Sequence, residues 1–348
     1  MRQAEFIEAV MGTIKLSREA LKNNLDIITH QVGGKDKIAV VLKDNAYGHG
    51  AVLIAQAARD YGITHAVVRL EREALEISEF FEDILILSDF PTVVNPKFHY
   101  VVNSLYYLKK FPKGTKVELK MDTGMHRNGV RMDELKKAFD AIATQGLECV
   151  GVMSHFKSAD TLSSEWFWQR YAFDTLKKDA LKFGQKYQWN LRFHLSNSAG
   201  IFRSSECSDD MVRVGIALYG CLQMDDSLSQ PQLKPVLSLW GDKISTRILR
   251  EGERVGYNGV YEAKSDEVVS TYDLGYANGL DRLASNRYAT PDNVRLLGRI
   301  SMDCATFASD VEELLIFNDA NQYAKAVGTI GYEILACLDK DLKRKWVD

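Results

Sequence analysis

The sequence has no apolar run long enough to cross a membrane. A membrane helix needs roughly 20 consecutive apolar residues, and no uncharged stretch of the 348 residues approaches that length. Glu5 and Glu8 also interrupt the apolar residues at the N-terminus, which argues against a secretory signal peptide. We therefore expect a protein that works in the cytoplasm and has no membrane partner.

The sequence is also poor in cysteine and in excess charge of one sign. Its five cysteines are scattered and form no C-x-x-C pair, which predicts free thiols in a reducing compartment. Its seven histidines show no H-E-x-x-H spacing, so we expect no metal site. The formal net charge of −3 gives no electrostatic basis for binding nucleic acid.

The first two-thirds of the chain alternate between strand-like and helix-like runs. Eight apolar, β-branched runs are separated by helical patterns, and this alternation predicts a (β/α)8 barrel. A doubly wound open sheet is the alternative from the pattern alone, but no G-x-G-x-x-G, P-loop or G-x-S-x-G motif supports its usual enzymes. The expected strands are Ile38–Leu42, His65–Val68, Ile84–Leu87, Tyr100–Val102, Val117–Met121, Cys149–Met153, Arg192–Leu195 and Val212–Leu218.

After Pro235 the runs become short and rich in glycine and β-branched residues, which predicts a separate antiparallel module. Its expected strands are Leu237–Leu249, Val268–Leu274 and Val294–Met302, and the charged run Asp339–Lys345 is expected to end a solvated helix. We therefore predict a barrel over residues 11–235 and a mainly β domain over residues 236–348, with residues 1–10 as a candidate addition to the latter.

One lysine lies where an apolar strand meets a glycine-containing loop. Lys43 follows the run Ile38–Leu42 and opens the sequence K-D-N-A-Y-G-H-G. In a parallel barrel the active site lies at this end of the strands. A lysine held there by apolar walls can lose its proton and form a Schiff base with a carbonyl cofactor. Considered alone, Lys43 is better explained as a surface lysine at a strand end.

The whole stretch Val40–Gly50 resembles the cofactor-lysine motif of alanine racemases, enzymes that bind pyridoxal 5′-phosphate (PLP). Asp44 is a departure, because alanine is common at that position of the motif. Further stretches resemble motifs of the same family in the same order along the chain. They are K-M-D-T-G-M-H-R-N-G (Lys120–Gly129), M-S-H-F (Met153–Phe156), H-L-S-N-S-A-G (His194–Gly200), V-R-V-G-I-A-L-Y-G (Val212–Gly220), G-Y-A-N-G (Gly275–Gly279), G-R-I-S-M-D (Gly298–Asp303) and G-Y-E (Gly331–Glu333).

The resemblance implies a two-base racemase. Lys43 would bind PLP as a Schiff base and then act as the base on one face of the substrate Cα. Tyr276 would be the base on the other face, and His155 would link it to Arg213. A permanently charged Arg213 facing the pyridine nitrogen would leave that nitrogen unprotonated. This weaker electron sink favours proton transfer over decarboxylation or transamination.

The remaining site residues are also assigned by resemblance. Lys120 would be carbamylated and would pair with Arg127. The other cofactor ligands would be Tyr47, Asn197, Ser198, Gly215, Ile216 and Tyr332, and the substrate would meet Arg127, Met302 and, at the entrance, Tyr288.

We therefore expect an alanine racemase that supplies D-alanine for peptidoglycan and forms a head-to-tail homodimer with shared active sites. Three alternatives remain at this level. A broad-specificity racemase has the same fold and chemistry, a barrel-type PLP decarboxylase has another reaction, and a non-catalytic PLP carrier lacks a second domain.

Overall fold

The computed structural model describes residues 12–348, and its contacts divide the chain into two compact units. The barrel unit comprises residues 20–47 and 51–234, and the β unit comprises residues 12–19, 48–50 and 235–348. Residues 1–10, the candidate addition to the second domain, lie outside the described residues.

Eight strands of the barrel unit form one parallel sheet in the order β10-β2-β3-β4-β5-β6-β8-β9. The two ends of this path meet through backbone hydrogen bonds, from Asp210 N to Phe193 O (2.9 Å) and from Arg213 N to Ser196 O (3.0 Å). The predicted barrel fold is confirmed. The strands are β2 (Ile38–Val41), β3 (His65–Val68), β4 (Asp83–Ile86), β5 (Phe98–Val102), β6 (Lys116–Asp122), β8 (Glu148–Met153), β9 (Arg192–His194) and β10 (Val212–Val214), with the short β7 (Val130–Arg131) paired to β6.

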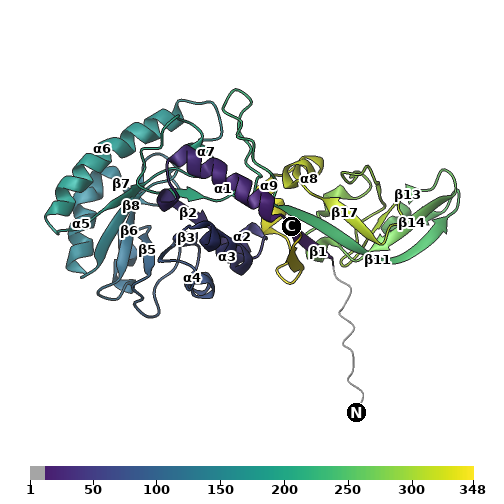
Figure 1. The fold of residues 1–348 in the computed structure, drawn as a ribbon, viewed down its shortest axis with the longest axis horizontal. Coiled ribbons are helices and arrows are strands. Elements are labelled where there is room, and N and C mark those ends of the chain that lie inside the picture. The colour runs from purple at the N-terminus through teal and green to yellow at the C-terminus, as the bar shows by residue number, and fades with distance from the viewer. Residues whose placement is uncertain (1–11) are drawn as a thin grey trace, which may run out of the picture. The chain divides into compact units, whose positions relative to one another are not determined.

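The strands form because their apolar residues are buried on both faces of the sheet. All four residues of β2 are buried, as a parallel strand covered by helices requires. Figure 1 shows α5 and α6 on the outer side of these strands. The helices of the barrel unit are α1 (Arg18–Val32, which begins in the β unit), α2 (Lys43–Tyr47), α3 (Ala51–Tyr61), α4 (Glu71–Ile77), α5 (Leu135–Thr144), α6 (Glu165–Gln185) and α7 (Ser198–Ile201), with 3-10 turns η1 (Lys35–Lys37), η2 (Leu105–Lys110) and η3 (Met132–Glu134).

The β unit is organised around the long strand β11 (Leu237–Leu249), which pairs antiparallel with three other strands. Its principal sheet has the order β15-β16-β14-β11-β1-β18, and β17 also pairs with β11. The other strands are β1 (Thr13–Leu16), β12 (Arg254–Val255), β13 (Tyr261–Glu262), β14 (Glu267–Tyr272), β15 (Leu296–Leu297), β16 (Ala305–Phe307), β17 (Glu313–Phe317) and β18 (Lys343–Trp346). The helical elements are α8 (Ala320–Val327), α9 (Gly331–Ala336), η4 (Tyr257–Gly259), η5 (Tyr276–Asn278) and η6 (Arg282–Ala284).

The sequence-based division assigned residues 11–235 to the barrel, but the structure places strand β1 in the β unit. It pairs antiparallel with β11, where Ile14 lies opposite Leu239, and parallel with β18. Ile14 and Leu16 are completely buried. A four-residue strand carries no signal for its partner, so only long-range pairing assigns it to the β unit.

Three predicted elements are wrong in type or extent. The run Val294–Met302 contains only the two-residue β15, because Gly298 has φ 72° and a Cβ there would lie 2.7 Å from Val255 O. The charged run Asp339–Lys345 leads into strand β18, which lies at the edge of the sheet, where lysines are common. The eighth barrel strand ends at Val214 instead of Leu218.

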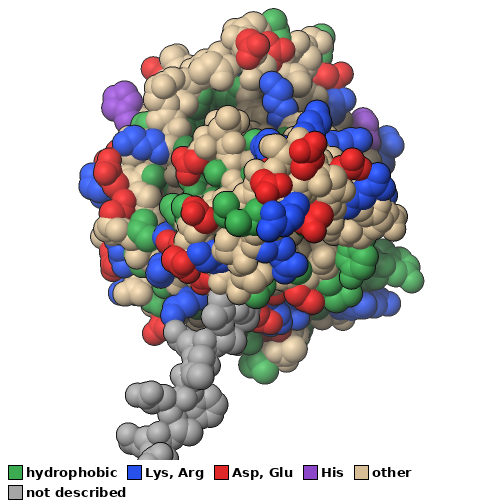
Figure 2. Space-filling model, turned by 90° about the vertical axis from the view of Figure 1, so that its right-hand side faces the viewer, with side chains coloured by type: hydrophobic (Ala, Val, Ile, Leu, Met, Phe, Trp, Pro, Cys, Tyr) green, Lys and Arg blue, Asp and Glu red, His purple; other side chains and the backbone are tan. Residues whose placement is uncertain are grey.

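No helix among residues 12–348 is both long enough and apolar enough to cross a membrane. Figure 2 shows Lys and Arg side chains interspersed with Asp and Glu on the face that it draws. Within the β unit, Arg254 pairs with Glu262 (2.6 Å) and Arg295 with Glu267 (2.8 Å). Exposed pairs of this kind contribute at most about 1 kcal/mol each, so the stability of the unit depends on its apolar interior.

Ile14→Ala should therefore destabilise the β unit selectively. The change removes completely buried apolar atoms from β1 and leaves a cavity, at a cost of about 3 kcal/mol. In hydrogen exchange, amides of β11 and β18 should lose protection while those of the barrel strands keep it. Ile248→Ala, on an exposed position of β11, should cost no more than about 0.5 kcal/mol. Equal loss of protection in the barrel strands would contradict the placement of β1.

Candidate active site

Lys43 lies directly after β2, at the C-terminal end of the barrel strands, as predicted. Its side chain is 35% exposed, and its Nζ lies 3.9 Å from a carboxylate oxygen of Asp44 and 5.8 Å from the centre of the Tyr47 ring. The amine is therefore accessible at the barrel mouth and has an aromatic side chain of the same motif beside it.

The four residues after Lys43 form a left-handed turn. Asp44, Asn45, Ala46 and Tyr47 have φ values of 54°, 55°, 54° and 51°. A left-handed backbone conformation destabilises a residue other than glycine by roughly 1–2 kcal/mol. The sequence predicted a loop here but gave no sign of this conformation. Four successive strained residues at a candidate catalytic lysine indicate that the surrounding structure over-determines the turn.

Hydrogen bonds from three directions hold this turn. The backbone N–H of Ala46 donates to Leu42 O (2.9 Å). Asp44 N–H donates to a carboxylate oxygen of Glu73 on α4 (2.8 Å), and the side chain of Asn45 accepts from Ala51 N–H at the start of α3 (2.8 Å). The Asn45 side chain thus links the turn to the following helix.

Arg213 is the buried centre of the candidate site. Its side chain comes from β10, and the residue is only 5% exposed. One terminal nitrogen donates to His194 Nδ1 (2.6 Å) and to His194 O (3.1 Å). The other donates to Ser154 O (2.7 Å) and Leu195 O (3.1 Å), and lies 3.4 Å from His155 Nδ1. Burial lowers the pKa of Arg213 to about 10, so the guanidinium keeps its charge at neutral pH.

The predicted contact between His155 and Arg213 is present. Burial and the charges of Arg213, Lys120 and nearby cations lower the pKa of His155 to about 3, so the imidazole is neutral. With Nδ1 facing the Arg213 donor, the ring proton belongs on Nε2. Gln169 from α6 fixes the backbone here, because its amide donates to His155 O (3.0 Å) and its oxygen accepts from Lys157 N–H (3.0 Å).

Lys120 extends from β6 toward the same region. It is 8% exposed, and its Nζ donates to Asn128 Oδ1. Burial, with the charges of Arg127 and Arg213, lowers the pKa of Lys120 to about 8. Arg127 itself is exposed. The charges of Arg127 and Arg213 therefore act on the Lys120 amine, partly opposed by the carboxylate of Asp122.

Four of the residues predicted to bind the cofactor lie together: Tyr47, Ser198, Gly215 and Ile216. Ser198 Oγ accepts from the backbone N–H groups of Gly215 (3.0 Å) and Ala217 (3.2 Å). Among residues 12–348, the N–H of Ile216 has no acceptor. A Cβ at Gly215 would lie 2.7 Å from the Tyr47 hydroxyl. Glycine therefore leaves room for the Tyr47 hydroxyl to reach this cradle.

The loop carrying Ser198 is held by a buried ion pair. Asp209 accepts from Arg170 (2.6 Å) and from the backbone N–H groups of Leu195 (3.1 Å) and Ser196 (2.7 Å). Burial raises the pKa of Asp209, but its hydrogen bond from Arg170 brings the pKa below its ordinary value. Asn197 then caps α7 by accepting from Gly200 N–H (2.9 Å). Asn197 therefore has a structural role as the N-cap of this short helix.

Two of the predicted site residues in the β unit are neighbours. Tyr276 opens η5 with its side chain 43% exposed, and its N–H donates to Ser301 O (3.1 Å). The next residue donates to Met302 O (2.9 Å), and Met302 is 54% exposed. A Cβ at Gly275 would lie 2.1 Å from Met302 O, so glycine permits this approach. Tyr332, on α9, is also exposed.

Tyr288 is placed differently from the prediction. It is 8% exposed, its hydroxyl donates to Ile316 O (2.7 Å), and its ring packs edge-on against Tyr323 with centroids 4.8 Å apart. Burial raises the pKa of Tyr288 well above its ordinary value. These contacts are those of a core residue, so the assignment as an entrance residue was wrong. Its position near the motifs carried no information about which way the side chain points.

The sequence analysis also missed a carboxylate. Glu118 on β6 is completely buried and contacts His194, Arg192 and His99. The signal was present: Glu118 and Lys120 stand two apart in an otherwise apolar strand, which places both on one face.

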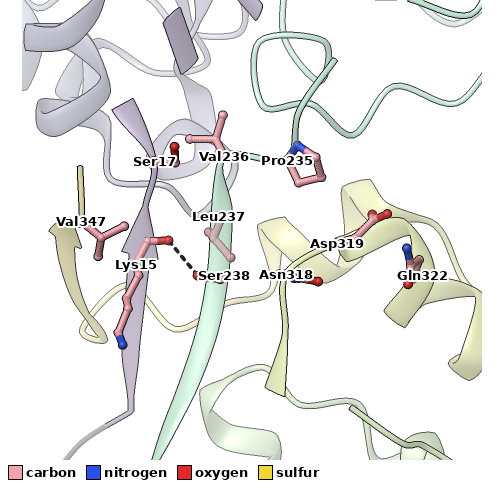
Figure 3. Close-up of a pocket in the computed structure, with 10 residues that line it drawn as sticks. All are labelled: Lys15, Ser17, Pro235, Val236, Leu237, Ser238, Asn318, Asp319, Gln322 and Val347. Atoms are coloured by element: carbon pink, nitrogen blue, oxygen red, sulfur yellow. Dashed lines mark hydrogen bonds between the residues drawn. The ribbon is translucent and has the colours of Figure 1, made fainter. Parts of the chain in front are cut away.

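A hollow in the β unit lies apart from all of these residues. It measures about 420 Å³, and one of its edges is the hydrogen bond from Ser238 Oγ to Lys15 O (3.3 Å), seen in Figure 3. Its lining residues are Lys15, Ser17, Pro235, Val236, Leu237, Ser238, Asn318, Asp319, Gln322 and Val347. None of the predicted site residues lines it, so we do not assign it to the active site.

Comparisons with known proteins agree with the geometry. The family model "Alanine racemase, N-terminal domain" matches residues 16–223, and "Alanine racemase, C-terminal domain" matches residues 236–346. An alanine racemase of a Nitratiruptor species is 47% identical over 97% of this chain and 100% of its own length. One from Campylobacter concisus is 45% identical with the same coverage.

A solved structure shows the same fold. The crystal structure of alanine racemase from D-cycloserine-producing Streptomyces lavendulae superposes with a TM-score of 0.84 at 25% identity, covering 97% of each chain. With both family models and full-length relatives in agreement, the chain belongs to the alanine racemase family.

Proposed function

We propose that this chain is a PLP-dependent racemase that interconverts L- and D-alanine and supplies D-alanine for peptidoglycan. The observation that carries the proposal is the buried Arg213 at the barrel mouth, with Lys43 at the end of the neighbouring strand and His155 in contact. Full-length similarity to alanine racemases supports the choice of substrate. The cytoplasmic location and the limits of the two domains stay predictions from the sequence.

The residues present fit the cofactor. The Ile216 N–H, the Gly215 backbone and the Tyr47 hydroxyl would form a cradle for a phosphate. Lys43 would hold the carbonyl end, and Arg213 would face the ring nitrogen. Bound there, PLP supplies the electron sink that acidifies the Cα–H of an amino acid. An arginine at the ring nitrogen limits that sink, which disfavours the decarboxylase alternative.

Two residues would carry out the proton transfers, one on each face of the substrate Cα. Lys43 takes or gives the Cα proton on one face, and Tyr276 does so on the other. A tyrosine with an ordinary pKa of about 10 is almost fully protonated at neutral pH, so it needs help to act as a base. The Nε2–H of neutral His155 would donate to the tyrosinate oxygen, and Arg213 behind it would add positive charge. Together the two residues would stabilise the tyrosinate that the proposal requires.

We further propose a homodimer in which Tyr276 of one copy completes the site of the other. The single chain supports this only by position: the lysine belongs to the barrel unit, whereas the tyrosine is an exposed residue of the β unit. The family resemblance supplies the head-to-tail arrangement.

The first test concerns the lysine that carries the cofactor. The protein purified with PLP should be yellow, and borohydride should attach the cofactor irreversibly to Lys43, identified by peptide mass spectrometry. Lys43→Ala should lose both the label and racemisation, whereas Lys15→Ala, on strand β1 of the β unit, should keep both. Label on Lys120 or another lysine in the wild-type protein would overturn the assignment.

The second test concerns carbamylation of Lys120. A neutral amine reacts with carbon dioxide to give a carbamate and a proton, and a pKa near 8 leaves much of the Lys120 amine neutral at pH 8. We expect a carbamate signal in ¹³C NMR after incubation with ¹³C-bicarbonate at pH 8, weakening as the pH falls to 6. The signal should vanish in Lys120→Met and persist in Lys116→Met, on the same strand. A signal that survives Lys120→Met would contradict the proposal.

The third test asks whether sites are shared between subunits. Lys43→Ala and Tyr276→Phe should each be nearly inactive, since each lacks one base. Refolding the two variants together gives mixed dimers in which one site carries both changes and the other neither, so about a quarter of wild-type activity should return. If both bases came from one chain, exchanged dimers would stay inactive.

A further inference from the structure

A completely buried carboxylate lies beneath the candidate site. Glu118 has no exposed surface, and it stands two residues before Lys120 on the same face of β6. One of its oxygens accepts from Arg192 (2.7 Å) and lies 3.4 Å from His99 Nδ1. The other oxygen contacts His194 Nε2. A buried charge is tolerated only with such partners.

His194 connects this carboxylate to Arg213. Its Nδ1 faces a guanidinium nitrogen of Arg213 at 2.6 Å, and a guanidinium can only donate. The imidazole must therefore be unprotonated at Nδ1 and protonated at Nε2, where the N–H donates to Glu118. Burial also lowers the pKa of His194, which keeps the ring neutral. The His194 ring therefore accepts a hydrogen bond from Arg213 at Nδ1 and donates one to Glu118 from Nε2.

Arg213 has no carboxylate in direct contact among the described residues. Its acceptors are the His194 and His155 rings and three backbone carbonyls. Burial lowers the pKa of Arg213, whereas the negative charges of Asp209 and Glu118 raise it. Of these two, Glu118 is connected to the guanidinium through a single side chain. Burial favours the neutral acid at Glu118, but His194 and Arg192 hold its pKa well below the ordinary value.

We propose that Glu118 is a positioning residue for racemisation, which acts through His194 to hold the charged guanidinium of Arg213 beneath the cofactor. The inference rests on the proposed function of Arg213. Without Glu118, His194 is free to carry its proton on Nδ1, where it would repel the Arg213 donors. Arg213 would then lose both its shortest side-chain hydrogen bond and one of its two compensating negative charges.

The competing role for Glu118 is purely structural. Arg192 also pairs with Asp83 through two contacts of 3.3 Å, so Glu118 and Asp83 belong to one ion-pair network in the barrel interior. Asp83 touches neither His194 nor Arg213 in this network. Asp83→Asn is therefore a matched control, since it weakens the network from the other side of Arg192.

The experiment compares three variants with the wild-type protein. Glu118→Gln preserves the shape and removes the charge, Glu118→Leu removes both charge and acceptor, and Asp83→Asn is the control. The first measurement is ¹⁵N NMR of the histidine rings in the cofactor-free protein, with the His194 signal identified by its loss in His194→Gln. The second is kcat and KM for alanine racemisation by the PLP-loaded protein, beside Arg213→Glu.

In the wild-type protein and in Asp83→Asn, His194 should be protonated on Nε2 alone. Glu118→Leu should show both tautomers, and its kcat should fall roughly 100-fold with little change in KM. Glu118→Gln should keep the tautomer and lose about tenfold in kcat, because only the charge is gone. Asp83→Asn should stay within about threefold of wild type in kcat even if its unfolding midpoint drops.

An unchanged kcat in folded Glu118→Gln, or an equal loss in Asp83→Asn, overturns the inference. Should Glu118→Leu fail to fold, the isosteric glutamine variant still decides between the two roles. The histidine spectrum needs no cofactor, so it tests the connection to His194 independently of the proposed function. That function fails separately if the wild-type protein does not racemise alanine, or if Arg213→Glu is unaffected.

Discussion

The candidate site depends on keeping one positive charge buried in the barrel. Removing a guanidinium from water is costly unless its donors are satisfied. Arg213 meets this condition with backbone carbonyls at the ends of β8 and β9 and with two imidazoles. Those carbonyls are positioned by the barrel itself, so the arginine is held by the fold as well as by neighbouring side chains. Burial and this charge lower the pKa of His155 and keep its ring neutral, and this charge also sets the direction of the His194 ring.

A second constraint is the left-handed turn after Lys43. Four strained residues are stable there because Glu73 and Asn45 supply hydrogen bonds that a regular loop would not need. The turn makes this segment rigid, because backbone geometry and the packing of Tyr47 against the barrel core together fix the position of Lys43 relative to Tyr47. In the proposed mechanism, this turn delivers the lysine and the phosphate-facing tyrosine to one site.

Much of the site was predictable because its chemistry is local in the sequence. Lys43 with Tyr47, Lys120 with Arg127, and Arg213 with Gly215 each belong to one short motif at the end of one strand. Parallel strands bring such ends to the same mouth of a barrel, so the motifs meet in space once the fold is known. Tyr288 was misjudged for the opposite reason. Whether Tyr288 faces the site or Ile316 is decided by packing between distant segments.

The sequence by itself determined a parallel sheet covered by helices, because apolar β-branched runs alternate with helical patterns along the first two-thirds of the chain. It also determined which residue types stand at the strand ends. Tertiary structure decided what these patterns cannot encode. The pairing of β1 with β11 assigned β1 to the β unit, and its pairing with β18 placed the charged residues Lys343–Lys345 in a strand. Side-chain contacts connected Glu118 to Arg213 through His194. These outcomes depend on long-range pairing and on the orientation of single side chains, and neither is set by a local pattern of residues.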